Sequence, residues 1–148
     1  MKVASATEAD IASWLVLART VEPLFGPMPM FDVTLRNNIA RRSASCVRDA
    51  SGAVAGGILL GGGAPDNWIR WLAVTAAARG QGIGSALLRH VLDLWPAPCT
   101  ISLATFGADN REGLAARRLY ERHGFIPGEM LPRGPEGGTR QRYTLVRR

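Results

Sequence analysis

Three glycines at alternate positions form the segment with the clearest capacity for chemistry. Gly80, Gly82 and Gly84 follow the strand-like stretch Trp68 to Val74 and open a stretch with apolar residues at helical spacing. Glycines let the backbone approach a ligand closely, and the first N–H groups of a helix lack intrahelical partners and lie at the positive end of its dipole. A strand, a glycine turn and a helix in this order predict an anion site.

The residue spacing excludes two common phosphate-binding folds. A P-loop needs Gly-Lys-Ser/Thr after its first glycine, and Lys2 is the only lysine of the chain. A dinucleotide-binding fold needs G-x-G-x-x-G after its first strand, whereas here the third glycine comes one place early and the turn follows the fourth expected strand. Neither an NTPase nor a Rossmann dehydrogenase is therefore predicted.

The glycine turn resembles the acyl-CoA pyrophosphate loop of the GNAT superfamily of N-acetyltransferases. Its sequence from Arg79 to Gly84, RGQGIG, fits the pattern [Arg/Gln]-x-x-Gly-x-[Gly/Ala]. Leu72 to Val74 lies upstream, and the downstream segment Leu119 to Phe125, LYERHGF, is similar to the superfamily's Leu-Tyr-x-x-x-Gly-Phe. The resemblance implies an α/β (α+β) GNAT fold with a central mixed, mostly antiparallel sheet flanked by about four helices, and acetyl-CoA as co-substrate with no metal.

The same resemblance implies roles for individual residues. The turn amides would hold the CoA pyrophosphate, the strand edge before them would bind pantetheine, and the amide of Val74 would polarise the thioester carbonyl. Tyr120 would protonate the departing CoA thiolate. The family often carries an asparagine seven places before this tyrosine; here that place is Gly113. Either the loop from Phe106 to Glu112 is longer and Asn110 takes over the contact, which we expect, or the contact is missing. The expected cofactor-binding residues are Leu72, Ala73, Val74, Arg79, Gly80, Gln81, Gly82, Ile83, Gly84, Ser85 and Asn110.

The residue that would deprotonate the amine is not evident from the sequence. Many family members carry an acid on the fourth strand, but Trp68 to Trp71 contains none. Asp66 just precedes this strand, and the acids that could reach the site from loops or strand ends are Glu22, Asp32 and Glu129. His123 is expected to be structural, and His90 is expected to lie on the polar side of the third helix. Deprotonation through an ordered water, or binding of an already neutral amine, is the alternative.

The expected elements follow the order βααβββαβαββ across residues 1–148, which we interpret as one domain. A capping box at Thr7 to Asp10 opens the first helix, prolines and glycines predict a non-helical loop from Glu22 to Phe31, and Asp32 is expected to cap a second helix. The later elements are strands at 44–48, 53–60, 68–74, 100–105, 125–127 and 141–146 and helices at 83–95 and 112–123, with a hairpin turn at 49–52, Gly61 to Gly63 ending that hairpin, Gly124 ending a helix, and a mobile loop at 132–139.

The composition and charge of the chain indicate which kinds of partner to expect. The chain has 47% hydrophobic and 20% charged residues. No apolar run reaches the ~18–20 residues of a membrane span, and no signal peptide is evident. We therefore expect a cytoplasmic protein without a membrane partner. Cys46 and Cys99 have no cysteine or histidine nearby and are expected to be buried and reduced. The net charge is +6, but the arginines are spread among acids, which makes nucleic acid an unfavoured partner. The sequence is also compatible with a homodimer.

These observations predict an acetyl-CoA-dependent N-acetyltransferase that moves an acetyl group to a primary amine by direct attack in a ternary complex. The missing strand acid favours one alternative, a catalytically silent acyl-CoA-binding regulatory module. The arginines are compatible with another, a toxin-like acetyltransferase acting on charged tRNA. The apolar segment Leu24 to Phe31 is expected to form a wall of the acceptor site, with Glu22 or Asp32 nearby to attract the cation. The acceptor itself is not identified.

Overall fold

A single seven-stranded sheet runs through the computed structural model, which describes residues 1–148. Its order is β1-β2-β3-β4-β5-β7-β6, and every neighbouring pair is antiparallel except β4 and β5. The predicted mixed, mostly antiparallel sheet is thereby confirmed. The strands are β1 (Val3–Ser5), β2 (Ala44–Arg48), β3 (Val54–Gly63), β4 (Asp66–Val74), β5 (Cys99–Phe106), β6 (Ile126–Leu131) and β7 (Arg140–Arg147).

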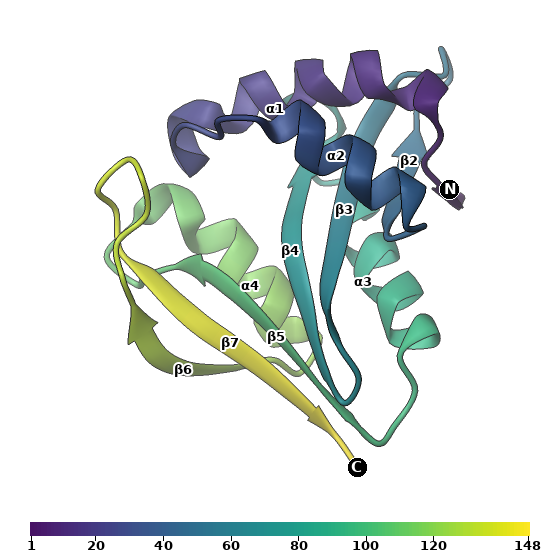
Figure 1. Ribbon diagram of the computed structural model, residues 1–148. Helices are drawn as coiled ribbons and strands as arrows, with labels where there is room; N and C mark the ends of the chain where they lie inside the picture. The colour runs from purple at the N-terminus through teal and green to yellow at the C-terminus, as the bar shows by residue number, and fades with distance from the viewer.

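Four helices pack on this sheet, two on each face (Figure 1). Helices α1 (Ile11–Phe25) and α2 (Phe31–Ala40) bury one apolar cluster, which includes Trp14 and Leu35, against β2, β3 and β4. Helices α3 (Ile83–Leu94) and α4 (Leu114–Arg122) bury a second cluster on the opposite face, which includes Leu87 and Ile101. Because neighbouring strand residues point to opposite faces, the sheet supplies both cores. None of the helices is long and apolar enough to cross a membrane.

Strands β4 and β5 separate soon after they pair. Only Asp66–Trp68 of β4 is in register with β5, opposite residues 100–102. Beyond this point β4 follows β3 and β5 follows β7, so their facing edges diverge (Figure 1). The register of β3 and β4 shifts between Leu59 and Leu60, which leaves Arg70 as an extra residue of β4. Such a bulge bends a strand and increases its twist, which contributes to the separation.

The loop predicted from Glu22 to Phe31 begins later than expected. Helix α1 continues through Pro23 to Phe25 and α2 begins at Phe31, so the prediction was wrong for its first four residues and its last one. Proline removes the N–H that would bond one carbonyl in the preceding turn, and one such loss near a helix end is tolerated when tertiary packing holds that turn. The helix ends at Gly26, whose φ is +85° and whose N–H donates to the Glu22 carbonyl at 2.7 Å.

Two other local predictions also need correction. Asp32 does not cap α2, because Met30 occupies the cap position and Asp32 lies in the first helical turn. Gly61 to Gly63 do not end a hairpin, since they continue β3 opposite Asp66–Trp68 and the chain turns at Ala64-Pro65. Sheet pairing here overrides the weak strand propensity of glycine.

Several other boundaries follow the prediction. The N–H of Thr7 donates to Asp10 Oδ2 at 2.8 Å in the capping box. The N–H of Asp49 donates to the Ala53 carbonyl at 2.8 Å in the predicted hairpin turn. Gly124 has a φ of +91° after α4, although a short 3-10 turn at Arg111–Gly113 replaces the start of that predicted helix. The loop at 132–139 contains a hydrogen-bonded turn, in which the Gly137 N–H donates to the Gly134 carbonyl at 2.9 Å.

Candidate active site

A cleft of about 660 Å³ opens where β4 and β5 separate. Its walls come from the end of α1 and the loop after it, β4, the glycine turn with the start of α3, β5 and α4. Ten of the residues predicted at the site line this cleft: Leu72, Ala73, Val74, Arg79, Gly80, Gly82, Ile83, Gly84, Ser85 and Tyr120. Gln81 and Asn110 are not among the lining residues. The fold therefore brings most of the predicted set to one place.

The glycine turn presents free backbone to the cleft. Gly80 and Gly82 have φ values of +78° and +81°, and a Cβ added to either would meet no atom within 4 Å. The first bond within α3 runs from the Ala86 N–H to the Gly82 carbonyl at 3.0 Å, so the preceding N–H groups are unpaired. Open space beside unpaired N–H groups at a helix N-terminus fits a phosphate group.

Gly84 has a different reason to be glycine. A Cβ there would lie 2.9 Å from Cδ2 of Leu119 on α4, so the missing side chain allows α3 and α4 to pack closely. The pattern of alternate glycines therefore combines two functions. Gly80 and Gly82 supply turn geometry and room for a ligand, and Gly84 positions α4, which carries Tyr120, against α3.

The edge of β4 that faces β5 is unpaired along the cleft. Leu72, Ala73 and Val74 are in register with β3 on one side and have no partner strand on the other. Alternate residues of a strand direct their N–H and C=O groups to opposite neighbours, so part of this backbone faces the cleft. An extended ligand with amide groups can add to such an edge in the manner of a further strand.

Tyr120 lies at the inner wall of the cleft and is 7% exposed. Its ring packs edge-on against those of Phe125 at 5.9 Å and Tyr143 at 6.3 Å between centroids. Burial raises the pKa of the Tyr120 hydroxyl well above its usual value, because the charged phenolate is poorly solvated there. The Tyr120 side chain is therefore a neutral phenol at neutral pH, and it carries its proton into the cleft.

The side chains of Asn110 and Gln81 are directed to local backbone groups. Asn110 Oδ1 accepts hydrogen bonds from the N–H groups of Glu112 at 3.0 Å and Gly113 at 3.3 Å. It caps the short turn before α4. Gln81 is exposed, and its Nε2 donates to the Ala77 carbonyl at 3.4 Å. The structure therefore brings neither side chain into the cleft.

Trp71 organises the opposite wall, a role that the sequence did not reveal. Its ring lies 5.9 Å from that of Phe25 and 5.1 Å from that of Phe31, and its Nε1 is 3.4 Å from the sulfur of Met28. Leu24, Phe25, Pro27 and Met28 all line the cleft. The predicted apolar segment thus packs over the cleft, although Met30 within it is 69% exposed.

Arg140 connects the end of α1 to the loop between β6 and β7 at the rim of the cleft. Its Nη2 donates to the Phe25 carbonyl at 3.2 Å and to Glu136 Oε1 at 2.6 Å, and its guanidinium lies 4.8 Å from the centre of the Phe106 ring. The paired guanidinium holds the pKa of Glu136 below its usual value. No local signal in the sequence indicates this residue, because its partners come from three separate segments.

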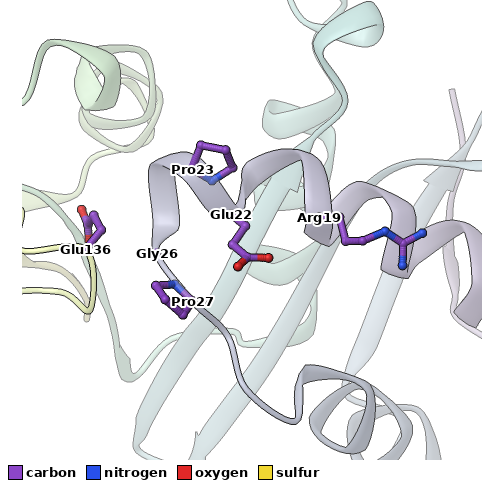
Figure 2. A pocket seen from close by; sticks show the side chains of 6 residues that line it. All are labelled: Arg19, Glu22, Pro23, Gly26, Pro27 and Glu136. Carbon is purple, nitrogen blue, oxygen red and sulfur yellow. The ribbon is translucent and has the colours of Figure 1, made fainter.

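Of the candidate bases, Glu22 lies outside the main cleft. It borders a separate depression of about 400 Å³ together with Arg19, Pro23, Gly26, Pro27 and Glu136. Figure 2 shows Glu22 projecting from α1 and Glu136 on the far side of Gly26. Pro27 borders both spaces, so the loop after α1 forms the partition between them.

The remaining candidates are also placed away from the cleft lining. Asp32 and Asp66 are exposed, and Glu129 lies 3.9 Å from Arg142. His90 Nε2 is 3.3 Å from Ser45 Oγ, and His123 Nδ1 is 2.9 Å from the Leu119 carbonyl, in agreement with structural roles. Glu112 is the only carboxylate among the lining residues.

Both cysteines are buried and free, as predicted. Neither lines the cleft. Burial, followed by the nearby charge of Asp10, raises the pKa of the Cys46 thiol to about 11, so it is not a ready nucleophile at neutral pH. The chain also contains no group of three or more histidine, cysteine, aspartate or glutamate side chains that could hold a metal ion.

Comparison with known proteins identifies the family. A model of the acetyltransferase (GNAT) domain matches residues 41–127, whereas a search of curated proteins found no match. The fold is similar to that of Ard1 from Thermoplasma volcanium, with a TM-score of 0.81 and 22% identity over 99% of this chain and 97% of that one. It is also similar to the ribosomal-protein-alanine N-acetyltransferase from Brucella melitensis, with a TM-score of 0.78 and 17% identity over 99% of both chains.

A third similar structure contains CoA. It is a chain of the NatC complex bound to Gag peptide and CoA, with a TM-score of 0.75 and 21% identity over 99% of both chains. At these identities the neighbours show the fold, while the match over residues 41–127 covers more than half of the sequence. This chain belongs to the GNAT family of acetyltransferases.

Proposed function

We propose that this protein transfers an acetyl group from acetyl-CoA to a primary amine by direct attack in a ternary complex. The observation that carries this proposal is the single cleft that joins three features: the glycine turn, the unpaired edge of β4 and the buried hydroxyl-bearing ring of Tyr120. These are the groups needed to hold a pyrophosphate, to align an amide-containing arm and to protonate a leaving thiolate.

Two parts of acetyl-CoA, the pyrophosphate and the pantetheine arm, match groups at the cleft. The open space at Gly80 and Gly82 and the unpaired N–H groups that begin α3 suit the pyrophosphate. The free edge at Leu72–Val74 suits the pantetheine amides, because it offers alternate donors and acceptors. Arg79 and Arg122 at the cleft add positive charge that favours a polyanionic ligand.

Within this arrangement the chain acts by positioning and by proton transfer. A neutral amine attacks the thioester carbonyl carbon, the C–N bond forms, and the Val74 N–H stabilises the negative charge that develops on the carbonyl oxygen. The C–S bond then breaks, and Tyr120 donates its proton to the departing sulfur. The proton lost from the amine nitrogen passes to solvent, from which the Tyr120 hydroxyl is reprotonated. Proximity of amine and thioester in one cleft supplies a large part of the rate.

A direct transfer agrees with the placement of the thiols. Both cysteines are buried outside the cleft lining, so no acetyl-cysteine intermediate is expected. Initial-rate kinetics with acetyl-CoA and an amine panel, followed by thiol release, test this proposal. Intersecting reciprocal plots support a ternary complex, whereas parallel plots, or loss of activity in Cys46→Ala with its fold intact, contradict it.

A catalytically silent acyl-CoA-binding module is the second candidate. It is favoured by the lining of the cleft, in which Glu112 is the only carboxylate and none comes from β4. The same kinetic panel separates the two candidates. Acetylation of any amine at a rate above the uncatalysed reaction rejects the silent module, and tight CoA binding without transfer supports it.

A further inference from the structure

One face of the β5-β7-β6 half of the sheet is not covered by a helix. Tyr143 and Leu145 of β7 pack in the core on the side of α4, so Arg142 and Thr144 point to the other side. Helices α1 and α2 pack on β2, β3 and β4 instead of on these strands (Figure 1). Arg140 of β7 lies on the same face as Arg142 and lines the cleft, so this open face borders the cleft.

Two arginines meet on one indole ring at this face. The guanidinium carbons of Arg70 and Arg142 each lie 4.9 Å from the centre of the Trp68 ring. Stacking on an aromatic ring restricts a guanidinium and keeps its N–H groups at the ring edge available for hydrogen bonds. We refer to Trp68, Arg70 and Arg142 as the arginine platform.

The positive charge of the platform is poorly compensated within the chain. Arg70 takes part in no ion pair. Arg142 Nη1 lies 3.9 Å from Oε2 of Glu129, a side chain that is 61% exposed, and its Nη2 donates to Ser102 Oγ at 3.0 Å. Its Nε is buried and has no hydrogen-bond partner. Arg70 is exposed and its side chain donates no hydrogen bond within the chain, so its guanidinium N–H groups are available to a ligand with acceptor oxygens.

The platform is adjacent to the proposed reaction site. Arg70 is the bulged residue of β4 and lines the cleft. Along the chain, Arg70 comes first, the Leu72–Val74 edge follows, and the glycine turn comes last. An acceptor held at Arg70 therefore approaches the thioester from the end opposite the pyrophosphate. Planar guanidinium groups match the paired oxygens of carboxylate and phosphate.

We propose that Arg70, held against the Trp68 ring on which Arg142 also stacks, binds an anionic group of the acceptor. The acceptor class is then a primary amine that carries a carboxylate or a phosphate a few bonds from its nitrogen. This inference rests on the proposed function, because it names the substrate class of the same cleft. It also predicts that the platform binds an anionic amine, and this binding can be measured even if no acetyl transfer occurs.

Matched acceptors test the anion requirement. O-phosphoethanolamine is compared with ethanolamine, and β-alanine with propylamine, at constant ionic strength. In at least one of the two pairs, we expect kcat/KM to be at least about tenfold higher for the anionic amine than for its uncharged partner. Arg70→Gln should remove that advantage, mainly by raising KM for the anionic amine. Arg89→Gln is the control, since Arg89 is exposed on α3. The inference is overturned if the enzyme prefers the uncharged amine in both pairs. It is also overturned if a preference for the anionic amine persists in Arg70→Gln.

A binding measurement separates this inference from the proposed function. The Trp68 indole N–H resonance, assigned through Trp68→Phe, is followed while the CoA-saturated protein is titrated with each amine. A saturable shift with an anionic amine alone, lost in Arg70→Gln, supports the platform even if no amine is acetylated. No shift, or equal shifts with the neutral partner, contradicts it even if N-acetyltransferase activity is found. Steeply salt-dependent tRNA binding that Arg70→Gln weakens would assign the platform to a nucleic-acid backbone instead and would also overturn it.

Discussion

Arg140 of β7 donates a hydrogen bond of 3.2 Å to the carbonyl oxygen of Phe25, a residue 115 positions earlier at the end of α1. The same guanidinium binds Glu136 through both terminal nitrogens, at 2.6 and 3.0 Å. One side chain therefore joins the loop after α1 to the loop between β6 and β7. These two loops form the rim of the cleft on its acceptor side.

Replacing Arg140 should separate these loops. We expect Arg140→Ala to raise the acceptor KM several-fold while leaving CoA affinity nearly unchanged, and to lower stability by roughly 1–3 kcal/mol through the lost charge-assisted bonds. Steady-state kinetics, calorimetry with CoA and denaturant unfolding measure the three effects. Arg133→Ala is the matched control, because the Arg133 side chain bonds only the Gly137 carbonyl within its own loop. Equal kinetic effects of both changes would contradict a bridging role for Arg140.

A bulky residue at Gly82 should block the pyrophosphate. Gly82→Val should weaken CoA binding by about 1.5–3 kcal/mol for each lost charge-assisted hydrogen bond, as measured by calorimetry. Valine is also strained at a φ of +81°. Gly52→Val carries the same strain at a φ of +88° in the hairpin turn, likewise with no atom within 4 Å of an added Cβ, and serves as the control. Unchanged CoA affinity in folded Gly82→Val would reject the phosphate assignment.

Removing the Tyr120 hydroxyl tests its role as proton donor. Tyr120→Phe keeps the ring that packs on Phe125 and Tyr143, so stability and CoA affinity should change little. Turnover should fall by roughly 10²–10⁴-fold if the hydroxyl acts as a general acid. Pre-steady-state and steady-state rates, together with thermal unfolding, measure this. Turnover within about twofold of the unaltered protein would make Tyr120 a packing residue, since a general acid contributes more than that.

The apolar wall around Trp71 should select the acceptor. Met28→Ala and Phe31→Ala remove side chains that contact Trp71, and each should raise the acceptor KM without a change in CoA affinity. Met30→Ala, in the same segment but 69% exposed, should leave both constants unaltered. If the two wall variants lose stability and keep their kinetics, the segment packs on the core without contacting the acceptor.

The buried carboxylate of Asp10 should make stability depend on pH. Its two oxygens accept bonds of 2.7 Å each from Arg48, and this pairing holds the pKa of Asp10 below its usual value. A lowered folded-state pKa stabilises the protein above the unfolded value of about 3.9, and that contribution is lost as the pH falls through the folded pKa. Asp10→Asn should therefore cost roughly 1–3 kcal/mol at pH 7 and progressively less below pH 4.

Denaturant unfolding of both proteins between pH 7 and pH 2 measures this difference. Asp32→Asn is the control, because Asp32 is exposed in the first turn of α2. A destabilisation by Asp10→Asn that stays constant over the whole range would mean that packing, and not the ion pair, accounts for it.

Local patterns in the sequence were sufficient for the element order and for the part of the cleft that the glycine turn and the β4 edge form. Helical spacing, the Asp49 to Gly52 turn and the left-handed position of Gly124 depend on neighbours within a few residues, and the structure agrees with each. The strand, glycine turn and helix around Gly82 are equally local. Their chemistry follows from free N–H groups at a helix N-terminus, whatever packs around them.

Predictions failed where tertiary packing outweighs local propensity. Packing of the α1 face holds its last turn together despite Pro23, and pairing with β4 keeps Gly61 to Gly63 in a strand. The amino acid types at these positions favour a loop or a chain end. Such conflicts are resolved by contacts with segments far away in the chain, which single-residue preferences do not contain.

The sequence by itself therefore determined the elements and the glycine turn, and only the tertiary structure decided the half of the cleft around Trp71 and Arg140. That half depends on where β4 and β5 stop pairing, which sets the open edge and brings Trp71 beneath Phe25. It also depends on the register of β7, which places Arg140 at the rim and Arg142 against Trp68. Contacts between residues so distant in sequence arise only when the whole sheet has formed, because strand register is set by the burial of entire faces.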